Sequence, residues 1–201
     1  MKPTVVNLMR YLGGLAALWG IAYVINGITQ AGAYVRIQVN PAAGTADQLR
    51  LSGVNMPYGV KLDTDQLPVH AWGSTVLEQA LSRGDVLLAG LCAFAGALLL
   101  ERLLMTFLQG RPFAPGNAAK VGRLAALVVV AGVGGPLLPT IAAWMALNRT
   151  ALAGTFTAAY DFSPVPPAIG LILTALAVFI RSGRTPEEEL TAPRLSRTTG
   201  S

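Results

Sequence analysis

The chain has 201 residues, of which 53% are hydrophobic and 12% are charged, and its mean hydropathy is +0.52. Soluble domains carry about 25% charged residues, so this sequence lacks the charge that would cover a water-facing surface, and its apolar content excludes intrinsic disorder. One cysteine and one histidine exclude a disulfide framework and a structural zinc site. The net charge of +5 is typical of membrane proteins, so we expect no direct binding of nucleic acid.

Four apolar stretches are long enough to cross a bilayer, which takes a helix of about 20 residues. The sequence predicts these helices at about 9–32, 84–108, 122–147 and 164–181. The expected fold class is therefore an all-α membrane protein, a single domain of four transmembrane helices. The first apolar stretch is longer than the roughly 7–15 apolar residues of a signal peptide, so we expect it to be retained rather than cleaved.

The segment 33–83, between the first two predicted helices, is too long and too polar for a tight loop. Every second residue of 35–39 is apolar, which is typical of a strand, and shorter alternations at 49–51 and 60–62 predict two more. Residues 74–82 predict a short amphipathic helix. We therefore expect a small β-rich segment outside the membrane.

The distribution of positive charge predicts the orientation. Ten of the fifteen Lys and Arg residues lie in three segments, 1–10, 101–123 and 181–201, which contain the start of the first predicted helix, the connection between the second and third, and the end of the fourth. Because Lys and Arg accumulate in cytoplasmic loops, we expect both termini in the cytoplasm. The expected location is the plasma membrane, as a multi-pass protein. The turn 109–121 and the tail 182–201 would then be cytoplasmic, and the segment 33–83 extracytoplasmic.

The predicted helices offer little chemistry. Their central portions contain no ionisable residue, and such residues mark proton relays and ion paths. No metalloprotease, esterase or nucleotide-binding motif occurs in the chain. Asp65, His70 and Ser74 are the residue types of a catalytic triad, but nothing around them marks a nucleophile. We therefore expect neither an enzyme nor a metal or cofactor site, and a coupled transporter is not favoured.

The third predicted helix carries a candidate kink at Gly134, Gly135, Pro136 and Pro139. Pro136 has no backbone N–H and leaves the carbonyl four residues earlier without its helical partner. Broken helices form binding sites in many transporters, so a small transporter or a binder of a hydrophobic or lipid ligand is the alternative to a purely structural kink. Small residues spaced four apart favour a compact bundle and leave a homo-oligomer open.

The segment after the second helix reads as a stiffened turn. Gly110 ends the helix, Pro112 prevents its continuation beyond Arg111, and Phe113 can anchor in the interface or cap the bundle. Asn117 is a candidate N-cap for the third helix. The fourth helix is expected to stop near Gly183, and the acidic residues that follow include Glu188 and Glu189.

These two segments resemble a four-helix bacterial membrane family catalogued as domain of unknown function 2975. Its G-x-P-F-x-x-x-N turn is matched at 110–117, and its terminal helix with following acidic residues is matched at 180–189. The helix count and the segment between the first two helices fit as well. The family has no established activity, and its members often lie beside small helix-turn-helix regulators, so the resemblance implies a regulatory pair.

The leading hypothesis from the sequence is a non-enzymatic regulatory or accessory protein in the lipid bilayer, which binds a partner such as a cytoplasmic regulatory protein. The candidate interaction motif consists of Gly110, Arg111, Pro112, Phe113, Asn117, Gly183, Glu188 and Glu189.

Overall fold

The computed structural model describes residues 3–42, 67–114 and 116–183. Four helical segments in these ranges are long and apolar enough to cross a membrane. They are α1 (Pro3–Ile28), α3 (Gly84–Leu108), the continuous run of α4 (Asn117–Val129), η1 (Val130–Gly134) and α5 (Gly135–Arg149), and α6 (Val165–Ser182). The remaining elements are α2 (Val76–Ser82) and the strands β1 (Val35–Pro41), β2 (Leu67–Ala71) and β3 (Phe156–Ala158). The predicted class, mostly helical with a small β portion, is confirmed.

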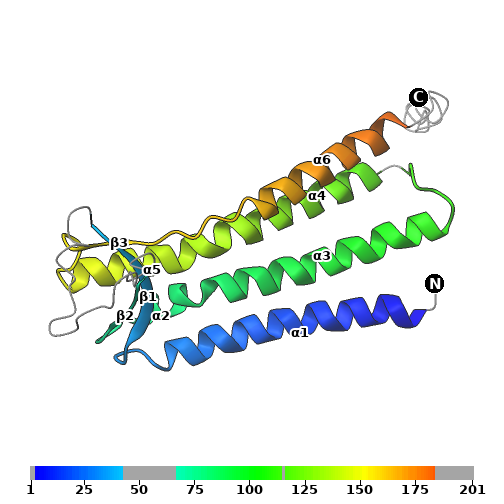
Figure 1. Cartoon of the computed structure of the whole chain (residues 1–201). Helices are drawn as coiled ribbons and strands as arrows, with labels where there is room; N and C mark the ends of the chain where they lie inside the picture. Colours follow the sequence, from blue (N-terminus) through cyan, green and yellow to red (C-terminus); the bar gives the residue numbers. More distant parts are fainter. Residues whose placement is uncertain (1–2, 43–66, 115, 184–201) are drawn as a thin grey trace, which may run out of the picture.

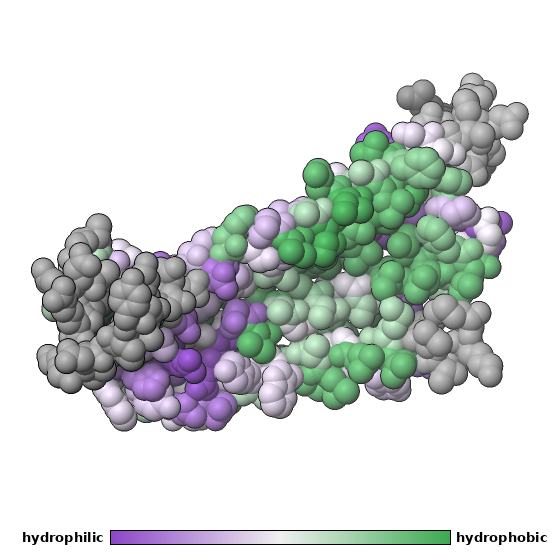
Figure 2. All heavy atoms as spheres, viewed as in Figure 1, coloured by the Kyte–Doolittle hydropathy of each residue, from purple (hydrophilic) through white to green (hydrophobic). Residues whose placement is uncertain are grey.

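The long helices form two pairs. Helix α1 lies along α3, and α4 lies along α6, with the second pair inclined to the first (Figure 1). The small sheet covers one end of the bundle, which we call the sheet end, and the start of α1 and the end of α6 lie at the opposite, terminal end (Figure 1). Apolar side chains cover much of the helical surface, and polar ones gather toward the sheet end (Figure 2). Trp19 on α1 is 68% exposed and Leu171 on α6 is 72% exposed, as expected for helices that face lipid.

Helix α1 begins at Pro3 rather than near residue 9. Two further helix ends also differ from the expected ones. Helix α1 ends at Ile28 rather than near residue 32, because turns follow it and Gly32 has a positive φ of 89°. The third membrane-length helix begins at Asn117 rather than near 122 and runs for 33 residues to Arg149. Both differences arise at the ends of the apolar stretches, where turn geometry rather than hydropathy decides where a helix stops.

The third membrane-length helix contains a π-helical turn, η1, directly before Pro136. Pro136 lies at the start of α5 and Pro139 inside it, and neither has an N–H for the helical ladder. The Thr140 hydroxyl donates to the Pro136 carbonyl oxygen at 2.9 Å and also contacts the Ala159 carbonyl oxygen at 3.1 Å. Single π-helical turns inside α-helices often occur at functional sites, and an apolar groove lies beside this one.

The sheet has the strand order β2-β1-β3, and both pairings are antiparallel. Strand β1 is where the alternating pattern of 35–39 placed it, whereas the predicted strands at 49–51 and 60–62 lie outside the described residues. The third strand corrects the sequence prediction, because β3 comes from the connection between α5 and α6 and not from segment 33–83. Three residues are too few to give a readable alternation, and only pairing with Val39 and its neighbours makes them a strand.

Strand β1 joins the sheet to the bundle. Val35, Ile37 and Val39 are each at most 3% exposed, and they form one apolar cluster with residues of α5 that include Ala143 and Leu147. Burying side chains of this size stabilises a fold by about 1.5–3 kcal/mol each. The sheet is therefore fixed to the third membrane-length helix and is not an independent domain.

Small residues set the contact between α1 and α3. A Cβ added to Gly20 would lie 2.8 Å from Leu87 Cα, and one added to Gly90 would collide with the Ala16 carbonyl oxygen. Backbones approach this closely in membranes only where one partner lacks a side chain. The small residues spaced four apart thus serve packing within the chain at Ala16, Gly20 and Gly90.

Candidate functional site

At the terminal end, Asn117 holds the turn after α3 together. Its side chain is fully buried, and its Nδ2 donates to the carbonyl oxygens of Pro112 at 3.0 Å and Arg111 at 3.3 Å. Its Oδ1 accepts from Thr106 Oγ1 and from Lys120 Nζ, both at 3.0 Å. One amide side chain therefore connects the end of α3, the turn and the start of α4.

This arrangement corrects the expected role of Asn117. The N-cap of α4 is Gly116, whose φ of 91° is in the left-handed region, and Asn117 is the first residue inside the helix. An asparagine near a helix start can satisfy helical N–H groups or loop carbonyls. Here the Asn117 side chain bonds the carbonyls of the turn, because the carbonyl oxygens of Arg111 and Pro112 lie within hydrogen-bond distance of its Nδ2.

Phe113 points inward and closes the same end. A Cβ added to Gly183 would lie 2.6 Å from Phe113 Cε1, and the ring centroids of Phe113 and Phe179 are 6.4 Å apart. Phe113 also packs against a buried cluster that contains Leu103 and Ile180. The structure therefore brings the turn and Gly183 together, as the candidate motif requires, and uses Phe113 for packing within the chain.

Two other members of the candidate motif, Gly110 and Arg111, are exposed, and two lie outside the described residues. Gly110 has a φ of 72°, which permits the chain reversal, and Arg111 is exposed with its side chain in no hydrogen bond or ion pair among the described residues. Glu188 and Glu189 lie outside the described residues. Arg111 is thus the charged group that this turn presents.

An apolar groove runs along the π-helical turn, between α3, the third membrane-length helix and α6. Its volume is about 450 Å³. Its lining includes Ala89, Cys92, Gly96, Leu127, Ala131 and Ile169. The groove exists because small residues line it from two helices. At Gly96, for example, there is room for a side chain, because the nearest neighbour of an added Cβ would be 3.7 Å away.

A second, polar cavity of about 330 Å³ lies at the sheet end. Strand β1 contributes Arg36 and Gln38, α3 contributes Asp85, and the chain between β3 and α6 contributes Asp161. Pro136, Pro139 and Thr140 of α5 form the wall toward the bundle. Sequence reasoning missed this cavity, because its three charged residues come from three separate segments of the chain.

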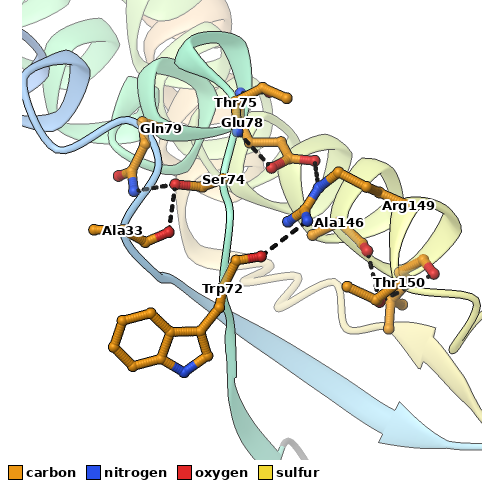
Figure 3. A network of polar contacts seen from close by, with 10 residues as sticks. Ala33, Trp72, Ser74, Thr75, Glu78, Gln79, Ala146, Arg149 and Thr150 are labelled. Carbon is orange, nitrogen blue, oxygen red and sulfur yellow. Dashed lines mark hydrogen bonds and ion pairs between the residues drawn. The ribbon is translucent and has the colours of Figure 1, made fainter.

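A buried ion pair joins α2 to α5 at the sheet end (Figure 3). Glu78 Oε1 accepts from Arg149 Nε at 3.0 Å, and the Glu78 side chain is 2% exposed. Glu78 Oε2 accepts from the Thr75 backbone N–H, and the Thr75 hydroxyl accepts from the Glu78 N–H, which completes a capping box. Arg149 Nη1 also donates to the Trp72 carbonyl oxygen at 2.9 Å. The Thr-x-x-Glu spacing was the sequence signal for this helix start.

The residues considered for a catalytic triad have other partners. Ser74 Oγ donates to the Ala33 carbonyl oxygen at 2.9 Å and accepts from Gln79 Nε2 at 2.7 Å (Figure 3). The His70 ring stacks on Tyr34, with centroids 4.5 Å apart. Among the described residues no hydrogen bond joins His70 to Ser74, and Asp65 lies outside them. Ser74 and Gln79 instead fix the start of β1 against α2.

The geometry therefore offers two places for a ligand, the apolar groove and the polar cavity, and one ordered turn for a partner. No family model, curated protein or solved structure matches the chain, so its resemblance to the four-helix bacterial family stays a prediction.

Proposed function

We propose that this chain is a multi-pass membrane protein that binds a hydrophobic ligand in the apolar groove beside the π-helical turn. The observation that carries the proposal is the groove of about 450 Å³, whose lining is apolar and contains no charged residue. Pockets of roughly 300–1,000 Å³ hold small ligands, and apolar lining favours a ligand that partitions into the bilayer. The kinked helix was the sequence feature that suggested this class of function.

The proposed setting is the plasma membrane, with both termini in the cytoplasm. The excess of Lys and Arg in the turn after α3 and beyond α6 supports this orientation. The turn and both described chain ends also lie at the same end of the bundle, as an even number of crossings requires (Figure 1). The proposal includes no catalytic step, metal or cofactor.

Cys92 provides the test, because it is the single cysteine of the chain and lines the groove. The rate of its alkylation by N-ethylmaleimide is measured on purified protein in micelles, with and without excess oleic acid. Oleic acid that occupies the groove should slow alkylation several-fold. The Ala131→Phe variant fills the groove and should remove this dependence on oleic acid.

The matched control is Ala126→Phe, on the exposed face of α4. It adds the same ring to the same helix without narrowing the groove, so oleic acid should protect Cys92 as in the unmodified protein. The proposal is wrong if oleic acid leaves the alkylation rate of the unmodified protein unchanged. It is also wrong if the two phenylalanine variants behave alike.

A second candidate function is the binding of a cytoplasmic regulatory partner at the terminal end. It is supported by a cavity of about 420 Å³ between α4 and α6, lined by Gly116, Ala119 and Arg181, beside the turn that presents Arg111. Because Asn117 holds that turn rigid, a partner would meet a preformed surface. The resemblance to the bacterial four-helix family adds the expectation of a regulatory pair.

The test of this second function compares Arg111→Glu with Gln109→Ala, a neighbouring exposed position. If a cytoplasmic partner binds here, reversing the charge of Arg111 should reduce its recovery with the purified protein, and Gln109→Ala should not. Equal recovery with both variants would contradict a role for this turn.

A further inference from the structure

The polar cavity and the apolar groove follow each other along the same three segments of the chain. On α3, Asp85 lines the polar cavity, and Ala89, one helical turn further on, lines the groove. On the third membrane-length helix, Pro136 lines the cavity and Gly132 the groove. Residues four apart lie on one helix face, so the two sites are neighbours along a single seam.

The third segment along this seam is the chain that leads into α6, and it too lines first the polar cavity and then the groove. Asp161 lines the polar cavity, and Pro166 at the start of α6 lines the groove. Between the two sites α3 meets the π-helical turn, where a Cβ added to Gly134 would lie 3.2 Å from Leu88 Cδ2. The side chain of Leu88 therefore lies against the π-helical turn between the two sites.

The two sites differ in chemistry as the two ends of an amphipathic molecule do. The groove is apolar and lies along segments that are apolar enough to cross a membrane. The cavity lies beside the sheet, where polar residues gather, and contains one guanidinium and two carboxylates. Among the described residues, the side chains of Arg36, Asp85 and Asp161 form no hydrogen bond or ion pair with one another or with a third group.

We propose that the polar cavity and the apolar groove together hold one phospholipid whose headgroup carries a primary ammonium as well as a phosphate. Arg36 pairs with the phosphate, and Asp85 and Asp161 accept hydrogen bonds from the ammonium, while an acyl chain occupies the groove. This inference rests on the proposed function of the groove and names its ligand. Its new element is the polar cavity as a headgroup site.

The charge of the cavity selects among common phospholipids. Two carboxylates beside one guanidinium leave an excess of negative charge, which disfavours an anionic headgroup such as phosphatidylglycerol. Phosphatidylcholine carries the same charges as phosphatidylethanolamine, but its quaternary ammonium has no N–H to donate. Phosphatidylethanolamine is therefore the lipid that satisfies all three side chains.

The experiment uses the full-length chain, freed of co-purified lipid by detergent exchange. It is incubated with an equimolar mixture of phosphatidylethanolamine, phosphatidylcholine and phosphatidylglycerol that share the same acyl chains. Bound lipid is counted by native mass spectrometry. Because a hydrogen bond to a charged group contributes roughly tenfold or less in affinity at a partly exposed site, we expect phosphatidylethanolamine to be enriched about three- to tenfold.

The variants separate the headgroup site from the groove. Asp85→Asn and Asp161→Asn should each reduce the preference for phosphatidylethanolamine. Neither side chain has a partner within the described part of the chain, so neither variant removes a contact there. Arg36→Gln should weaken all three phospholipids about equally. Glu101→Gln removes one negative charge from the terminal end and should leave the preference unchanged.

The remaining outcomes distinguish lipid binding in the apolar groove from headgroup binding in the polar cavity. If Ala131→Phe abolishes lipid binding but the unmodified protein shows no preference, the headgroup site is wrong and the groove stands. If Ala131→Phe binds lipid as the unmodified protein does, the groove itself is wrong. Preference for phosphatidylglycerol, or an equal loss with Asp85→Asn and Glu101→Gln, would overturn the assignment of the carboxylates.

Discussion

The buried polar side chains at the two ends of the bundle form hydrogen bonds of different range along the chain. At the sheet end, Glu78 and Arg149 are 71 positions apart in the sequence, and the Gln79 side chain bonds a carbonyl 45 positions away. At the terminal end, the hydrogen bonds of Asn117 reach at most 11 positions. The hydrogen bonds at the sheet end therefore join distant segments of the chain, whereas those of Asn117 lie within one short segment. The distant contact of that segment is the packing of Phe113 against Phe179.

The largest expected effect comes from breaking the ion pair at the sheet end. Arg149→Met leaves the Glu78 carboxylate buried without its positive partner, and removing one partner of a buried pair costs about 3–5 kcal/mol. Because the Arg149 side chain is 30% exposed, we expect a loss near 3 kcal/mol in the free energy of unfolding. Unfolding by SDS in mixed micelles measures it.

A double variant sharpens this result. In Glu78→Leu with Arg149→Met, no charge is left buried, so part of the lost stability should return. Loss of the same size in the double variant as in Arg149→Met would contradict a cost from the unpaired charge larger than the contribution of the capping box, which Glu78→Leu also removes.

The next effect concerns the contact between α1 and α3, which spans both ends. Gly90→Ala places a methyl group against the Ala16 carbonyl oxygen, which is backbone and cannot move aside alone. Overpacking of this kind costs about 1–3 kcal/mol. Thermal unfolding in micelles should show a lower midpoint for this variant.

Gly14→Ala, on α1, is the matched control for that substitution. A Cβ at Gly14 meets nothing within 4 Å, so the same added methyl group should leave stability unchanged or raise it slightly. Equal destabilisation by the two variants would contradict a specific cost of the close approach between Gly90 and Ala16, because Ala is the better helix former at both positions.

A smaller effect is expected at the terminal end. Asn117→Ala removes the four hydrogen bonds that hold the turn, but water can reach the exposed carbonyls, so we expect a cost of about 1 kcal/mol. Hydrogen exchange should accelerate in residues 106–117 and stay unchanged in β1. If exchange in β1 accelerates as well, the two ends are coupled and the comparison drawn above fails. Gln109→Ala, exposed in the same segment, serves as the control.

The smallest effect belongs to the ion pair between α1 and α3. Arg10 Nε lies 3.5 Å from Glu101 Oε2, but the Arg10 side chain is 57% exposed, so solvent screens the pair. Arg10→Gln should change stability by at most ~1 kcal/mol, and this difference should disappear at 1 M salt. A difference that persists at high salt would indicate a contact other than the charge.

Features that depend on local composition could be predicted from the sequence. The four apolar helices, strand β1, the start of α2 near 74 and the bend at 110–117 each follow from hydropathy, alternation or turn residues within one short stretch. The glycines and prolines of the third helix marked the place of the π-helical turn without giving its form.

Only the tertiary structure decided what depends on distant segments. It pairs β1 with Phe156–Ala158 and places Arg149 beside Glu78. It also shows that Asn117 bonds the carbonyls of the turn and is not the N-cap of α4. It also placed Arg36, Asp85 and Asp161 around one cavity. Hydropathy and spacing record how a residue relates to its near neighbours, whereas these contacts arise from the packing of helices whose order in space no short stretch of sequence encodes.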